Sequence, residues 1–222
     1  MTTYRLDDDL SFCHIDGRPI FLDTKDDRYF RLSGTLERAF NAHVEDADLP
    51  PEDIAHLVER RILTETPSFA SNTGASIPIA SRSALELSSL PAPRGIGAVA
   101  ELFAIVCWTQ FQLKTRNLKE ILDDVITRRP LGSPLEGDGA ELRLLNETYV
   151  FLKARKFVPI ETRCLLDSLS MVTLLARRGL HANIVFGVTS YPFTAHCWVQ
   201  ARELILNDTI GNTKAYTPIR VI

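Results

Sequence analysis

The stretch from Cys164 to Asp208, CLLDSLSMVTLLARRGLHANIVFGVTSYPFTAHCWVQARELILND, decides the fold class of this chain. Its first part is apolar at helical spacing and ends at Gly179, a natural C-terminal cap, so it predicts a helix that begins at the cysteine. The sequence then changes to strand-like segments that are rich in β-branched and aromatic residues and separated by turns, at 182–189, 194–200 and 203–206. A helix followed by a β-meander predicts an α+β domain.

The same stretch supplies a thiol, an imidazole and a carboxylate. Cys164 opens a helix, where free backbone N–H groups, the helix dipole and the neighbouring Arg163 favour a thiolate. His196 lies in the second strand and Asp208 follows the third, and a turn near Arg202 would place the two side chains beside each other. We therefore predict Cys164 as nucleophile, His196 as base and Asp208 as the acid that orients the base. The backbone N–H of Cys164 is a candidate oxyanion donor.

Each of these residues also has a structural interpretation. A cysteine in an apolar helix is often a buried small hydrophobe, and a histidine in a strand often only forms structural hydrogen bonds. The dipeptide before Thr209 is typical of a turn. Of the other cysteines, we expect Cys107 to be in the core, Cys13 to pack in an N-terminal hairpin, and Cys197 to be structural and to face away from His196.

Bulk properties exclude several classes of protein. The chain has 222 residues, a net charge of −3, 45% hydrophobic residues and four cysteines. The charge gives no basic footprint for nucleic acid, and the cysteine spacing predicts no metal site. The sequence has no Walker A, GxGxxG, HExxH or GxSxG motif. The polar N-terminus does not resemble a signal peptide, and the apolar stretch 96–108 is too short for a membrane span, so we expect a cytoplasmic protein.

The chain divides by composition. Residues 1–65 predict a small module of three strands and two helices, with a hairpin turn at Asp16-Gly17 and a helix capped by Ser33. Residues 66–94 are rich in serine and proline and predict a linker with one short helix near 83–87. Residues 95–222 form the second domain. It is expected to begin with helices at 96–114 and 118–128 and a further helix through Ala154.

The second domain resembles a known family, the lasso-peptide B proteins, which are transglutaminase-like leader peptidases with a papain-like arrangement of helices and antiparallel sheet. The resemblance covers residues 96–222 and rests on five pieces, of which those with the Cys, the Ala-His-x-Trp and the Asn-Asp occur in family order. They are TRCLLDSL (162–169), LARRGL (175–180), IVFGV (184–188), FTAHCWV (193–199) and LND (206–208). It implies that the nucleophile, base and acid are Cys164, His196 and Asp208. The family usually has a small residue in place of Cys197.

Residues 1–65 resemble the family's winged-helix-like recognition module, which is similar to the PqqD proteins. The resemblance implies that this module binds the leader of a precursor peptide as an added strand at its sheet edge. On the third strand of the module, Tyr29, Phe30 and Arg31 are candidate leader-binding residues, although the aromatic side chains could equally belong to the core.

The implied reaction is removal of the leader from a ribosomally made lasso-peptide precursor. The implied partners are this precursor and an asparagine-synthetase-like cyclase that closes the macrolactam ring. Family members also need ATP, for which the sequence has no nucleotide motif, so ATP acts through the cyclase or at a site that the sequence does not reveal. Two alternatives remain open: an acyl transferase of the transglutaminase or arylamine acetyltransferase kind, and a peptide-binding scaffold without activity.

Overall fold

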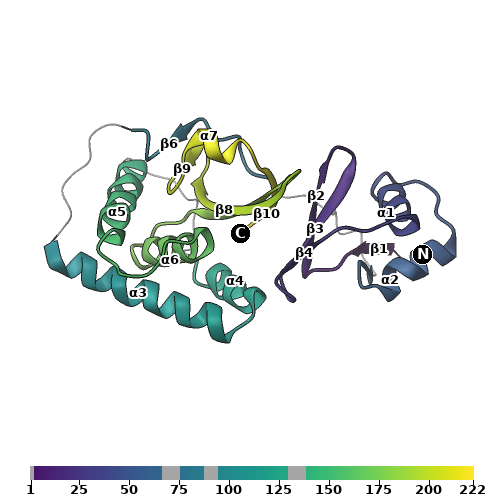
Figure 1. The fold of residues 1–222 in the computed structure, drawn as a ribbon, viewed down its shortest axis with the longest axis horizontal. Helices are drawn as coiled ribbons and strands as arrows, with labels where there is room; N and C mark the ends of the chain where they lie inside the picture. Colours follow the sequence, from purple (N-terminus) through teal and green to yellow (C-terminus); the bar gives the residue numbers. More distant parts are fainter. Residues whose placement is uncertain (1–2, 67–75, 88–94, 130–138) are drawn as a thin grey trace. The chain divides into compact units, whose positions relative to one another are not determined.

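A computed structural model describes residues 3–66, 76–87, 95–129 and 139–222. The chain forms two compact units, Met1–Ser76 and Ile77–Ile222 (Figure 1). Both units combine helices with antiparallel strands, which confirms the predicted α+β class. None of the helices in the described ranges has the length and apolar composition that a bilayer crossing requires.

The N-terminal unit is built on a three-stranded antiparallel sheet in the order β2-β3-β4. Asp16 and Gly17, between β2 and β3, have φ angles of 53° and 74°, so the predicted two-residue hairpin turn is confirmed. A second sheet pairs β1, at the start of the unit, with β5, at its end, in antiparallel orientation. The strand β1 was not predicted. The elements are β1 (Thr3–Leu6), β2 (Leu10–Ile15), β3 (Arg18–Asp23), β4 (Arg28–Phe30), α1 (Thr35–Val44), α2 (Pro51–Glu59) and β5 (Leu63–Thr66).

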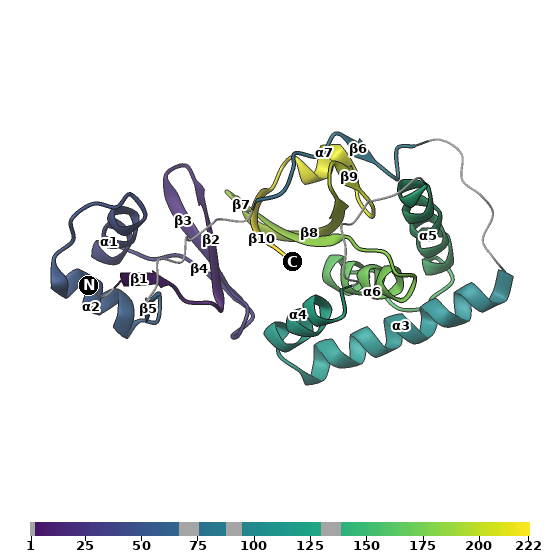
Figure 2. The same ribbon diagram turned by 180° about the vertical axis from the view of Figure 1, so that it is seen from behind.

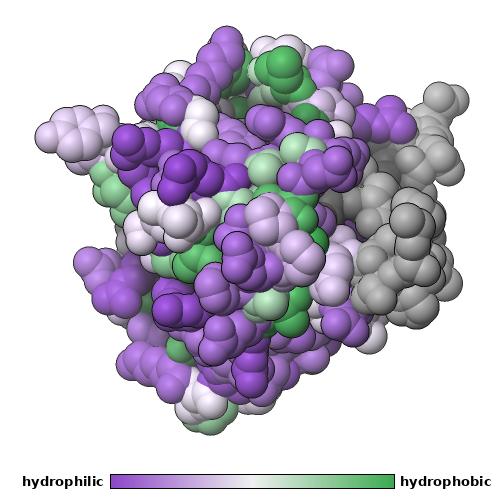
Figure 3. Space-filling view, turned by 90° about the vertical axis from the view of Figure 1, so that its right-hand side faces the viewer, coloured by the Kyte–Doolittle hydropathy of each residue, from purple (hydrophilic) through white to green (hydrophobic). Residues whose placement is uncertain are grey.

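Aromatic rings form the centre of this unit's core. The fully buried Phe21 stacks on Phe30, with ring centroids 5.1 Å apart, and meets Phe40 of α1 edge-on at 4.8 Å. The outer face of α1 and α2 is mostly hydrophilic (Figure 3). The cap of α1 differs from the prediction: the N-cap is Gly34 instead of Ser33, because the chain turns there at a φ of 59°, which glycine adopts without strain.

The second unit contains a five-stranded sheet in the order β10-β7-β8-β9-β6, covered by helices. The helix α6 lies between this sheet and α3, so the helix that begins at Cys164 is central to the unit (Figures 1 and 2). The elements are β6 (Arg82–Ser83), α3 (Gly95–Thr115), α4 (Leu118–Thr127), α5 (Ala140–Arg155), α6 (Cys164–Arg177), β7 (Asn183–Ser190), β8 (Phe193–Ala201), β9 (Leu204–Ile205), α7 (Ile210–Thr213) and β10 (Thr217–Val221).

The segment assigned to a linker needs correction. Its residues 67–75 and 88–94 lie outside the described residues, but residues 77–87 pack on the second unit. No helix forms at 83–87: β6 pairs in parallel with β9, and a turn follows. Serine and proline content predicted a spacer because composition does not show where a short segment finds a sheet edge.

Candidate active site

Cys164 occupies the first position of α6. Its predecessor Arg163 is extended, with φ of −138°, so the helix starts abruptly and the thiol is exposed at its N-terminal end. The buried Arg155 fixes this start. Its guanidinium donates to Asp167 of α6 at 2.7 Å and to the backbone carbonyls of Val158 and Glu161 in the preceding loop. The first-turn N–H groups of a helix have no acceptor within the helix, so they are available to an anion.

His196 and Asp208 are brought together by the hairpin of β8 and β9. The strands pair with Gln200 opposite Ile205, and the turn contains Arg202 at φ of 52°, as the sequence predicted. Continuing past β9, the chain places Asp208 Oδ2 at 2.5 Å from Nε2 of His196. Both side chains are largely shielded, with 18% and 15% of their surface exposed.

Three groups besides His196 hold Asp208. The backbone N–H of Thr209 donates to Oδ1 at 2.7 Å, and the Asn212 amide donates to Oδ2 at 2.9 Å. Ser83 of β6 donates from its hydroxyl to the backbone carbonyl of Asp208 at 2.5 Å. Burial alone would raise the pKa of Asp208, but the hydrogen bonds from His196, Thr209 and Asn212 outweigh it and lower that pKa.

The thiol and the imidazole ionise each other. Hydrogen bonds from the Cys197 side chain, from His196 and from the backbone N–H of Cys197 lower the pKa of Cys164 to about 4, against the opposing effect of burial. Hydrogen bonds to Asp208 and Cys164 raise the pKa of His196 to about 9. Because Nε2 is bonded to Asp208, Nδ1 is left for the sulfur. At neutral pH the site therefore contains a Cys164 thiolate and a His196 imidazolium, and the imidazolium is hydrogen-bonded to the Asp208 carboxylate.

Cys197 takes a larger part than expected. It is buried, as predicted, and its Sγ lies 3.8 Å from the Ser168 hydroxyl of α6. It also contacts Cys164, and the hydrogen bond between the two side chains, together with burial, raises the pKa of Cys197 well above the ordinary value. The alternation of side chains along the strand predicted that Cys197 faces away from His196, and the structure agrees. However, alternation gave no sign that α6 would bring Cys164 within reach of both residues.

Aromatic side chains pack against the His196 ring. Its centroid lies 5.1 Å from Tyr216 and 6.1 Å from Trp198, and the Trp198 contact agrees with the shared strand face predicted for these two residues. Gly187 pairs directly with His196 on the neighbouring strand. A Cβ atom at Gly187 would lie 2.8 Å from Trp198 and 2.9 Å from Tyr216, so a side chain is excluded there.

A cavity of about 250 Å³ lies at this site, and Cys164, His196 and Asp208 all line it. Four further residues of the site had no role predicted from the sequence: Ser83, Ser168, Asn207 and Asn212. Asn207 accepts from the Val199 N–H at 2.7 Å and donates to the Ser168 hydroxyl at 3.0 Å, which ties the strand of His196 to α6. Asn212 had one signal in the sequence, its spacing of four residues from Asp208.

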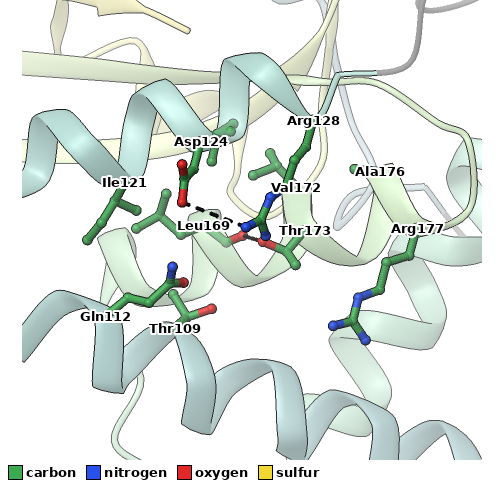
Figure 4. Close-up of a pocket in the computed structure, with 11 residues that line it drawn as sticks. Thr109, Gln112, Ile121, Asp124, Arg128, Leu169, Val172, Thr173, Ala176 and Arg177 are labelled. Atoms are coloured by element: carbon green, nitrogen blue, oxygen red, sulfur yellow. Dashed lines mark hydrogen bonds and ion pairs between the residues drawn. The ribbon is translucent and has the colours of Figure 1, made fainter. Parts of the chain in front are cut away.

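A separate cavity of about 210 Å³ lies among α3, α4 and α6 (Figure 4). Thr109 and Gln112 of α3 lie on one side of it. Arg128, at the end of α4, reaches toward Asp124 at 3.7 Å. The residues that line this cavity include no cysteine or histidine, so the thiol chemistry belongs to the first cavity.

The fold and the site define an α+β domain with a thiol at a helix N-terminus, an imidazole within β8 and a carboxylate in the loop after β9. A family model described as the transglutaminase-like superfamily matches residues 93–221. The chain belongs to this superfamily, whose chemistry is compatible with a cysteine peptidase or an acyltransferase. Neither the curated proteins nor the solved structures gave a match.

Proposed function

We propose that this chain is a cysteine peptidase that removes the leader from a ribosomally synthesised lasso-peptide precursor. The observation that carries the proposal is the convergence of Cys164, His196 and Asp208 in one cavity, with a pKa of about 4 for the thiol and about 9 for the imidazole. A nucleophile that is ionised at neutral pH, next to a protonated acid, is what acyl transfer from a peptide requires.

The geometry supports a two-step hydrolysis. The Cys164 thiolate attacks the scissile carbonyl carbon, and the backbone N–H of Cys164 stabilises the oxyanion. The His196 imidazolium gives its proton to the departing amine, which becomes the new N-terminus of the core peptide. Neutral His196 then takes a proton from water, which attacks the thioester and releases the leader with a free carboxylate. Asp208 fixes the tautomer and orientation of the ring in both steps.

The N-terminal unit is assigned to leader recognition. In the described part of this unit β4 is an edge strand that pairs with β3 alone, and an extended peptide can add to such an edge. A cavity of about 540 Å³ follows this edge and is lined by Arg28 and Phe30 of β4 and by Val58 of α2. Tyr29, Phe30 and Arg31 remain the candidate contacts. Phe30 also stacks on Phe21, so part of its role is in the core.

The proposed reaction takes place in the cytoplasm, where thiols stay reduced, before an asparagine-synthetase-like cyclase closes the ring. The family resemblance also implies ATP. The hydrolysis proposed for Cys164 has no step that uses ATP.

The test is incubation of the protein with a lasso-peptide precursor, followed by mass spectrometry. A peptidase gives two products whose masses sum to the precursor plus one water, and labelled water enters the leader carboxylate. An acyltransferase, the second candidate compatible with the family, would instead join the acyl group to an added amine. Unchanged precursor with retained binding would indicate a scaffold. Cleavage by Cys164→Ala would contradict the assigned nucleophile.

A further inference from the structure

A short segment at the start of the second unit, residues 77–86, lies along the hairpin that carries His196 and Asp208. We name this segment the strap. Its strand β6 pairs in parallel with β9, and the N–H groups of Ser81 and Ala84 donate to the carbonyls of Glu203 and Ile205 at 2.9 and 2.8 Å. Ile77 and Ala80 pack on a cluster that includes Trp198 and Ile205.

The strap continues beyond β9 to the loop of the catalytic acid. The Ser83 side chain is buried, with 1% exposure, and its hydroxyl donates to the backbone carbonyl of Asp208 at 2.5 Å. Its oxygen in turn accepts from the N–H of Leu85 at 3.1 Å. Three residues along the strap, the Glu86 carboxylate accepts from the N–H of Ile210 at 3.2 Å. The strap therefore holds the backbone at Asp208 itself and two residues after it.

Two further contacts anchor the strap to the body of the unit. The hydroxyl of the buried Tyr149, on α5, donates to the Ala84 carbonyl at 3.0 Å. The Gln200 amide donates to the Pro78 carbonyl at 2.7 Å. The strap is thus connected to α5 and to the strand of His196, as well as to the Asp208 loop.

We propose that Ser83 is a positioning residue for the active site, which acts through the backbone of Asp208. Ser83 fixes the Asp208 backbone, so that the carboxylate, already bonded by Thr209 and Asn212, meets Nε2 of His196 at 2.5 Å. A carboxylate can hold a histidine ring in one orientation only if the backbone that carries the carboxylate is itself fixed. The family match begins at residue 93, so the strap lies outside it.

This inference rests on the proposed function for the role of Asp208. Its test uses the full-length Ser83→Ala protein, with Ser81→Ala as matched control. Ser81 is an exposed serine of the same strap, and its hydroxyl bonds to Glu203 instead of Asp208. We expect Ser83→Ala to lower kcat for precursor cleavage about 10- to 100-fold with KM changed less than twofold. Ser81→Ala should match the wild type.

A second measurement needs no substrate. NMR titration of His196 should show its pKa, about 9 in the wild type, falling toward the ordinary 6.5 in Ser83→Ala, because the bond to Asp208 loosens. If the wild type cleaves no precursor, the proposed function fails, and this titration still tests Ser83. The variant Tyr149→Phe removes the hydrogen bond to the Ala84 carbonyl but keeps the volume of the ring. It should lower kcat and the pKa of His196 in the same direction as Ser83→Ala, but by less. Wild-type kcat and His196 pKa in the folded variants would overturn the proposal.

Discussion

At the scale of single residues, the charge on Cys164 decides whether the site reacts at neutral pH. The thiol has a pKa of about 4, so the thiolate forms as pH rises through that value and persists above it. We expect the rate of Cys164 alkylation by iodoacetamide to be flat between about pH 5 and 8. An ordinary thiol with pKa near 8.5 gains about tenfold per pH unit over the same range.

The same measurement in variants separates the causes. Cys197→Ala removes the side-chain hydrogen bond to the thiolate, and His196→Gln removes the imidazolium, so each should raise the alkylation pKa of Cys164. Cys13 serves as an internal control, because burial raises its pKa to about 11 and it should stay unmodified at pH 6. A tenfold rise per pH unit for Cys164 in the wild type would contradict the ion pair.

The three proposed catalytic residues should differ in weight. Cys164→Ala and His196→Ala each remove a group that makes or transfers a bond, and should lower kcat/KM about 10⁴-fold or more. Asp208→Ala leaves both reacting groups in place and should cost less, about 10²- to 10⁴-fold. Single-turnover cleavage of a precursor, followed by mass, measures all three. Equal losses in Asp208→Ala and His196→Ala would show that Asp208 does more than orient the ring.

Sequence reasoning reached these three residues because each has a local signal: a helix start, a strand and the end of a hairpin. The geometry of the hairpin at Arg202 sufficed to pair His196 with Asp208. Cys197 and Ser83 were missed because their partners come from distant elements, Cys164 in one case and Asp208 in the other. Nothing near either residue in the sequence indicates such a partner.

At the scale of secondary-structure elements, the packing of β7 on β8 supports the His196 ring. Gly187→Ala would place a Cβ atom within 3 Å of the buried Trp198 and of Tyr216, both of which pack against that ring. We expect the free energy of unfolding to fall by about 1–3 kcal/mol, since neither aromatic side chain can move away freely. Urea denaturation measures this change, and kcat should fall with it.

A control for this substitution is Gly211→Ala in α7, because a Cβ atom there would meet no other atom within 4 Å. That variant should keep wild-type stability and activity. If Gly187→Ala were as stable as the wild type, the aromatic packing against β7 would not hold the ring in place.

The longer elements were predictable and the shortest were not. The helices α3 to α6 and the strands β7 and β8 follow clear apolar periodicity, and their predicted ranges agree with the structure to within a few residues. The strands β1, β6 and β10 and the helix α7 were not predicted. Of these, β1 and β6 have only a few residues and acquire their conformation from a partner strand, β5 or β9, so the local sequence carries little of the signal.

At the scale of the whole molecule, the chain contains two units with separate cores. The N-terminal core is formed by residues such as Phe21, Phe40 and Leu57, all of which are fully buried within residues 1–76. Each unit therefore has the apolar packing needed to fold alone. Under the proposed function, the fused arrangement would act through effective concentration, because a leader bound to the first unit would keep the cleavage site near the second.

This arrangement predicts different effects on two substrates. A protein of residues 77–222 retains the strap and the active site but lacks the proposed leader-binding unit. We expect its kcat/KM for the full precursor to fall about 10²-fold or more, the range in which linked binding modules gain affinity. Cleavage of a short peptide that spans the cut but lacks the leader should match that of the full chain, because such a peptide has nothing for the first unit to bind.

Residues 1–76 alone should bind the isolated leader in fluorescence anisotropy and, added in excess to the full chain, should inhibit precursor cleavage by competing for the leader. The variant Tyr29→Ala should weaken this binding, while Val44→Ala, at an exposed position at the end of α1, should not. If 77–222 cleaved the precursor as efficiently as the full chain, the first unit would have no part in substrate capture. The specificity would then have to come from the cavity around Cys164.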